Sequence, residues 1–200
     1  MPDRYHQSEY LIRRKVLKLF GATFYIYGPG GEQGELMFYT KMKAFKLKED
    51  IRLYTGEDMT EELLTIKARN IWDISTTYDV IDATTGEPVG ALQRRGAKSI
   101  LRDTWNILDT DDTEIGSIQE DSMLLAVTRR LLNQVIELNL IPQSFEAEIG
   151  GRPAMTLKQN FNPFVQKLTL DIVDETGELF DPRMAIAAGV LMLAIEGRQG

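Results

Sequence analysis

The chain has 200 residues, of which 43% are hydrophobic, enough to bury the core of one domain. Its formal net charge of -7 means that the protein as a whole repels nucleic acid and anionic membranes, unless a local basic patch reverses the sign. It has no cysteine, which excludes disulfides, thiolate metal sites and cysteine nucleophiles.

The first nine residues are polar, and we expect residues 1–9 to be a flexible tail before a single domain over residues 10–200. The tail lacks the apolar run of a secretory signal, and its mixed charges do not suit an organelle transit peptide. We therefore expect a cytoplasmic protein, with peripheral membrane association as an option. The only histidine, His6, lies in this tail, so histidine-based triads and metal clusters are nearly excluded.

Beyond the tail, short alternating strands are separated by turns rich in Gly, Pro, Asp and Glu, a pattern typical of successive hairpins. One unit recurs, since residues 105–118 repeat the pattern of residues 78–92 with a turn one residue shorter. A long meander leaves edge strands exposed, and closure into a barrel removes them. The sequence therefore predicts a mainly β fold, a closed antiparallel β-barrel. Looser versions of the unit start at residues 24–27, 145–149 and 168–172.

Residues 123–138 depart from the strand period. Their apolar side chains recur at helical spacing along one stripe, and the polar ones share the opposite side. This predicts an amphipathic helix that begins at Asp121 or Ser122 and ends by Ile141, ahead of Pro142.

A second helix closes the chain. Asp181 suits its N-cap, Pro182 its first position and Gly197 its end. Between Arg183 and Glu196 no side chain is polar, so this helix must be surrounded on every side. Its twelve residues rise about 18 Å, against a hydrocarbon core of roughly 30 Å, which favours a buried helix over a membrane span. We predict that it fills the barrel.

Several stretches together carry a resemblance to a known family. They are RRKVLKL (residues 13–19), AFKLKEDIR (44–52), ELLTIKAR (62–69), YDV (78–80), GEPVG (86–90), RRG (94–96), KSILRD (98–103) and the closing apolar helix. In these stretches the chain resembles the LURP-one-related family, part of the wider superfamily of tubby C-terminal domains and phospholipid scramblases. The resemblance implies a twelve-stranded barrel around a central C-terminal helix.

For function the resemblance implies less, because the superfamily's members differ. Tubby domains bind phosphoinositide head groups, whereas scramblases are membrane-linked and calcium-responsive. This chain lacks the cysteine cluster and the long membrane span of scramblases, and it shows no match to the lipid-binding residues of tubby domains. No site residue is therefore transferred from either group.

Basic residues cluster at three places despite the acidic total. If their segments are strands, alternation puts Arg13 with Lys15, and Lys41 with Lys43, on shared outward faces. Such a patch would hold anionic head groups at about 1 kcal/mol per residue. The ordinary alternative is that these side chains only guard strand surfaces and edges. The candidate anion- or lipid-binding residues are Arg13, Lys15, Lys41, Lys43, Arg94, Arg95, Lys98 and Arg102.

Two loops resemble ligand sites only superficially. The acidic turn at residues 109–114 lacks the central glycine and the distal glutamate of a calcium-binding loop, which favours a solvated hairpin tip. The glycine-rich residues 28–34 have the wrong spacing for a phosphate-binding loop, and no helical pattern follows them. A hairpin connection is the better interpretation.

The residue inventory favours binding over catalysis. No serine lies in a nucleophile-elbow pattern, and 30 acidic residues are too many for a carboxylate pair to be diagnostic. We expect a non-enzymatic barrel, without cofactor, metal or transmembrane segment, that binds anionic phospholipid or phosphoinositide head groups on its outer surface or rims. The alternative is a protein-interaction or self-associating scaffold. A carboxylate enzyme is least favoured, and the net charge disfavours nucleic acid.

Overall fold

The computed structural model describes residues 3–17, 21–42, 50–70, 77–95, 104–120, 143–160, 165–173 and 177–195. The strands in these ranges are β1 (Glu9–Leu17), β2 (Gly21–Tyr27), β3 (Leu36–Met42), β4 (Asp50–Tyr54), β5 (Glu62–Ala68), β6 (Thr77–Asp82), β7 (Pro88–Arg94), β8 (Thr104–Leu108), β9 (Glu114–Glu120), β10 (Ser144–Ile149), β11 (Arg152–Asn160) and β12 (Gln166–Ile172). The helices are η1, a short 3-10 helix at Gly31–Gln33, and α2 at Pro182–Ile195.

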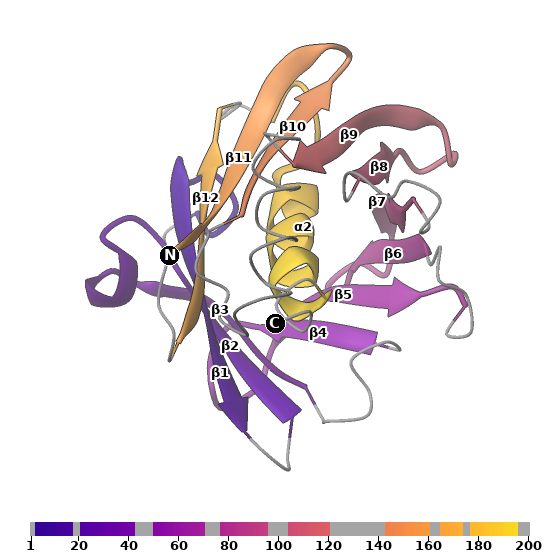
Figure 1. The fold of residues 1–200 in the computed structure, drawn as a ribbon. Coiled ribbons are helices and arrows are strands. Elements are labelled where there is room, and N and C mark those ends of the chain that lie inside the picture. Colours follow the sequence, from indigo (N-terminus) through magenta and orange to yellow (C-terminus); the bar gives the residue numbers. More distant parts are fainter. Residues whose placement is uncertain are drawn as a thin grey trace, which may run out of the picture.

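The strands form one closed barrel (Figure 1). Each strand pairs antiparallel with its neighbours in sequence, and β12 closes the ring by pairing with β1 from Glu9↔Asp171 to Arg14↔Gln166. Closure leaves no edge strand to template aggregation. The predicted closed antiparallel barrel is confirmed, with twelve strands, the number that the family resemblance implies.

The recurring unit of the sequence corresponds to two successive hairpins, β6–β7 and β8–β9. In each hairpin the register shifts next to the turn, because the second strand carries one extra residue there, Val89 in β7 and Ile115 in β9. Gly90 of β7 has a φ of 154°, and a Cβ there would lie 2.6 Å from the carbonyl oxygen of Leu108. Only glycine therefore lets β8 approach β7 so closely.

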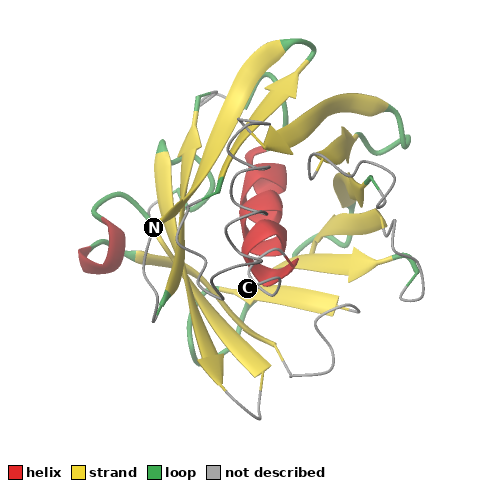
Figure 2. Cartoon of the chain, viewed as in Figure 1, coloured by secondary structure: helices red, strands yellow, loops and turns green. Residues whose placement is uncertain are grey.

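Helix α2 is buried along nearly its whole length, from Met184 to Ala194. It contacts β1 and β12, and also β6 and β7, which lie across the ring from them (Figure 1; Figure 2). A Cβ at Gly189 would lie 2.5 Å from the Cδ1 of Ile12, so glycine at mid-helix permits this approach to β1. The predicted start is confirmed, because Pro182 is the first helical residue and Asp181 accepts a 2.9 Å hydrogen bond from the Arg183 amide.

An arginine holds the C-terminal end of α2. Arg14 is buried on the inner face of β1, and its Nη1 donates to the Leu193 carbonyl oxygen at 3.3 Å and to Gln166 Oε1 at 2.7 Å. Its guanidinium also lies 5.8 Å from the ring centroid of Phe24. A cation at this end satisfies a terminal carbonyl and complements the helix dipole.

A second arginine ties the start of α2 to the β6–β7 hairpin. Arg183 pairs with Asp181 and, at 2.5 Å, with Asp82 at the end of β6. Burial opposes ionisation of Asp82, but hydrogen bonds from Thr84 and Arg183 prevail and lower the pKa of its carboxyl. The two ends of the helix are thus fixed by opposite parts of the ring.

The first described residues contact the barrel. Tyr5 packs on Phe38 with ring centroids 5.2 Å apart, and the Tyr10 hydroxyl donates to the Arg4 carbonyl oxygen at 2.9 Å. The flexibility expected for residues 1–9 stays a prediction. The amphipathic helix predicted over residues 123–138 lies outside the described residues. Among the helices that the structure does describe, none combines the length and apolar character needed to cross a membrane.

Candidate anion-binding surface

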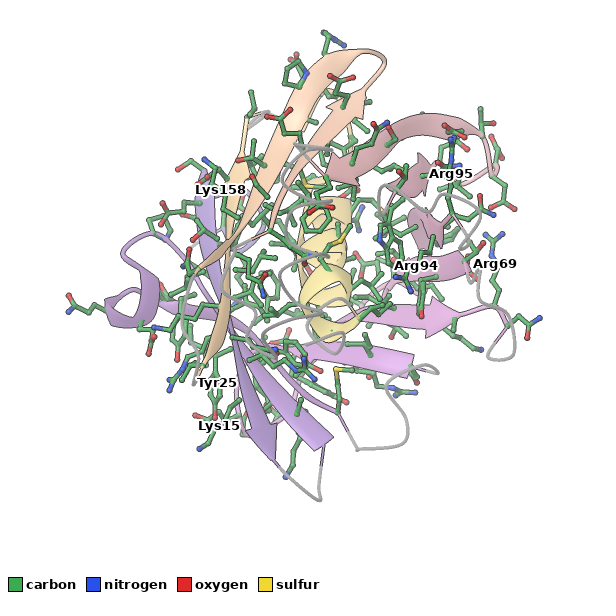
Figure 3. The ribbon with its side chains drawn as sticks, viewed as in Figure 1. Lys15, Tyr25, Arg69, Arg94, Arg95 and Lys158 are labelled. Carbon is green, nitrogen blue, oxygen red and sulfur yellow. The ribbon has the colours of Figure 1, made fainter. Side chains whose placement is uncertain are left out.

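Two predicted lysines lie in one row across the outer face of three strands. Lys15 of β1 pairs with Thr23 of β2, and Thr23 pairs with Lys41 of β3. Directly paired residues project from the same face of a sheet, and two strand spacings place the lysine backbones about 10 Å apart. Both lysines are exposed, and neither forms an ion pair with another described residue (Figure 3 labels Lys15).

Arg13 shares this outer face but has an internal partner. Its Nη1 lies 3.1 Å from Oε2 of Glu32, in η1. The other oxygen of Glu32, Oε1, lies 2.5 Å from the Nζ of Lys167, which pairs directly with Arg13 across the β1–β12 seam. The hydrogen bond from Lys167 lowers the pKa of Glu32, opposed by desolvation and assisted by the charge of Arg13.

Tyrosines continue the same face next to the basic residues. Tyr25 of β2 pairs with Arg13 on one side and with Tyr39 of β3 on the other. Its ring lies 5.4 Å from that of Tyr39, edge on, and 6.3 Å from that of Tyr27, nearly parallel. Burial, reinforced by the charge of Glu57, raises the pKa of Tyr25, so its phenol stays neutral at physiological pH. The face therefore offers both cations and amphipathic rings.

The second predicted group lies on the far side of the ring, on β7 and just after it (Figure 3). Arg94 pairs with the buried Trp105, which puts it on the inner face of the wall. Arg95, the next residue, is exposed and donates to Asn106 Oδ1 at 2.6 Å and to Glu114 Oε1 at 3.1 Å. The structure therefore does not bring these arginines together with Lys15 and Lys41.

The other three predicted site residues lie outside the described residues. They are Lys43, Lys98 and Arg102.

The acidic turn of the β8–β9 hairpin is held by protein donors. Asp112 receives two bonds from Arg69, at 2.6 and 3.1 Å, and Arg69 also donates to Asp79 at 2.7 Å. Asp109 accepts from the amides of Asp111 and Thr113. Within the described ranges, no group of three or more acidic or histidine side chains could hold a metal ion. These hydrogen bonds are typical of a hairpin turn.

A comparison with known families decides the membership of the chain. A sequence model of the LURP-one-related family matches residues 36–193, from β3 to the last turn of α2. The chain belongs to the LURP-one-related family. No curated protein and no solved structure matches it. In this family member, Lys41 and Lys167 lie inside the matched residues, whereas Arg13, Lys15 and Glu32 precede them.

Sequence patterns did not identify the charged residues that neighbour or pair with the predicted residues on the outer face of the barrel. Glu32 stands in a glycine-rich connection, Lys167 at the start of a strand, and Arg69 just after one. Only the register shows that Lys167 is the cross-strand neighbour of Arg13, 154 positions earlier in the chain. Alternation along a single strand carries no information about that partner.

Proposed function

We propose that this LURP-one-related protein binds anionic phospholipid head groups, including phosphoinositides, through the outer face of β1, β2 and β3. The observation that supports this most is the row Lys15–Thr23–Lys41, in which two exposed ammonium groups flank a hydroxyl residue without an ion pair to any described residue. Phosphate oxygens placed above this row would accept from both amines. On this proposal the protein attaches to membranes peripherally, through the lipid head groups.

The size of the electrostatic contribution suits a reversible membrane contact. Each lysine near an anionic surface contributes about 1 kcal/mol, so two contribute about 2 kcal/mol, or roughly 30-fold in affinity. The net charge of -7 opposes approach, but charges beyond a Debye length of about 8 Å are largely screened at physiological salt. Tyr25 and Tyr27 add rings of the type that settles at the boundary between head groups and acyl chains.

We also propose that α2 fills the barrel, so that the interior is not a ligand site. In support, one apolar cluster includes buried side chains from the barrel strands and from α2. A wall and a core built in this way leave the outer faces and rims for binding. The protein is accordingly proposed to be a non-enzymatic binding module.

Vesicle co-sedimentation tests the proposal. Wild-type protein should pellet with phosphatidylcholine vesicles that contain phosphatidylserine or a phosphoinositide, and not with phosphatidylcholine alone. The double variant Lys15→Ala/Lys41→Ala should bind the anionic vesicles roughly 30-fold more weakly. The control, Lys67→Ala/Lys158→Ala, removes two exposed lysines from β5 and β11, the second of which lies 3.9 Å from Asp171, and it should bind like the wild type. Equal affinity of the two double variants would refute the role of Lys15 and Lys41.

A further inference from the structure

We propose that Arg13 and Lys167 form a second anion subsite on this surface, which the chain itself closes with the carboxylate of Glu32. A phosphate or carboxylate group from outside would bind there in competition with Glu32. The subsite rests on the proposed function for its physiological ligand, a lipid head group. Its existence rests only on the contacts of these three side chains.

The first support is the direct pairing of two cations. Arg13 and Lys167 are register partners across the β1–β12 seam, which brings their Cβ atoms about 5 Å apart. Like charges placed directly opposite in a sheet destabilise it, so this pair requires an anion. Glu32 supplies one, with one oxygen 3.1 Å from Arg13 and the other 2.5 Å from Lys167.

The second support is donor capacity that Glu32 does not use. The Nε of Arg13 is buried and has no hydrogen-bond partner. The nearest contact between Arg13 and Glu32 is through Nη1, and the buried Nε takes no part, whereas a guanidinium binds a planar or tetrahedral oxyanion best through two nitrogens. A phosphate with three or four oxygens can therefore satisfy donors that one carboxylate leaves open.

The loop that carries Glu32 is built independently of the ion pairs. The amide of Gly28 donates to the carbonyl oxygen of Glu35 at 2.9 Å and closes the neck of the connection between β2 and β3. Inside it, the Gly34 amide donates to the Gly31 carbonyl oxygen at 2.8 Å. Figure 2 shows η1 as the short red coil outside the barrel wall. A change of the Glu32 side chain alone should therefore empty the subsite and leave the loop in place.

Position links this subsite to the proposed surface. Arg13 and Lys15 project from the same face of β1 two residues apart, a separation of about 7 Å along the strand. About one third of the Arg13 side chain and one quarter of the Lys167 side chain are accessible, at 32% and 26%. With Glu32 displaced, four cations would face one membrane. Glu32 thus sets how strongly the surface attracts anions.

The test compares Glu32→Gln with Glu35→Gln. Both variants remove one negative charge from the same loop, but Glu35 forms no ion pair with a described residue, so it controls for net charge. Glu32→Gln should bind anionic vesicles about fivefold more tightly than Glu35→Gln. Adding Lys167→Ala to Glu32→Gln should remove this gain. Equal vesicle affinities for the two single variants, together with equal responses to phosphate, would overturn the proposal.

Sodium phosphate, titrated at constant ionic strength, separates the subsite from the membrane. Thermal unfolding of Glu32→Gln should shift upward with phosphate, and that of Glu35→Gln should not, because a ligand that binds only the folded state stabilises it. If phosphate shifts Glu32→Gln while no variant binds vesicles, the subsite stands and the lipid function fails. If Lys15 and Lys41 are needed for vesicle binding but Glu32→Gln equals Glu35→Gln in both assays, the lipid function stands and the subsite fails.

Discussion

Basic residues on the inner and outer faces of the barrel wall differ in what they contact. Arg14 faces inward and holds the end of α2, whereas its neighbours Arg13 and Lys15 face outward on the same strand. The inward arginine donates to a helix carbonyl and to Gln166, whereas Arg13 pairs with Glu32 and Lys15 is exposed to solvent. Strand alternation alone therefore divides one run of like charges between a structural clamp and the outer face that we propose binds anions.

The largest expected effect is on the inner side. Arg14→Met removes a buried donor from the Leu193 carbonyl oxygen and from Gln166. We expect it to lower the free energy of unfolding by about 2 to 4 kcal/mol, because a buried charged hydrogen bond is lost and its acceptors stay buried. Arg13→Met, one residue away, should cost less than about 1 kcal/mol. Urea unfolding of both variants measures the difference, and equal losses would contradict the assignment of inner and outer roles.

The second prediction concerns the other end of α2 and depends on pH. Asp82→Asn should lower the free energy of unfolding by about 1 to 2 kcal/mol at pH 7, because Arg183 loses a charged partner at the barrel wall. The folded-state pKa of Asp82 lies below its usual value of 3.8, so its contribution is present above about pH 4. It is lost as the pH falls through the folded-state pKa.

Urea unfolding of the wild type and Asp82→Asn between pH 7 and pH 3 checks this sign. The difference in the free energy of unfolding should shrink toward the acid end of the series. A difference that grows on acidification would show that Asp82 is not stabilised as a carboxylate. Thr84 also donates to Asp82. The variant Thr84→Val therefore separates the contribution of this turn to the free energy of unfolding from that of the Arg183 ion pair.

The third prediction concerns the outer side. Lys15→Ala/Lys41→Ala should change the free energy of unfolding by no more than about 0.5 kcal/mol, because both side chains are exposed and unpaired among the described residues. Its vesicle affinity should nevertheless fall, and the salt dependence of the remaining binding should be weaker than in the wild type. Sedimentation at 50 and at 500 mM sodium chloride measures this. An unchanged salt dependence would place the contact elsewhere.

The smallest combined effect on stability and vesicle affinity is expected for Arg95, on the opposite wall. Arg95→Ala breaks an exposed ion pair with Glu114, and such pairs contribute about 0 to 1 kcal/mol. Vesicle affinity should not fall, since Arg95 is already neutralised and lies across the ring from Lys15. A loss of vesicle binding in this variant would move the membrane contact to β7 and the β8–β9 hairpin.

Much of the fold could be predicted because it follows from local patterns. Strand alternation and turn residues predicted the repeated hairpins of residues 78–92 and 105–118. The cap residues predicted the start of α2 at Pro182. The outward direction of Arg13 and Lys15 followed in the same way. By contrast, the neighbouring Arg94 and Arg95 looked like one cluster, although alternation sends them to opposite faces of the wall.

By itself, the sequence determined the two classes of element, the family, and the face on which Arg13, Lys15 and Lys41 lie, because these depend on residues a few positions apart. The tertiary structure alone decided which cations are available. Closure of β12 on β1 brings Lys167 beside Arg13, the fold of the β2–β3 connection places Glu32 between them, and register aligns Lys15 with Lys41 through Thr23. Charge neutralisation depends on distance in space, and that distance is set by the register of strands far apart in the chain.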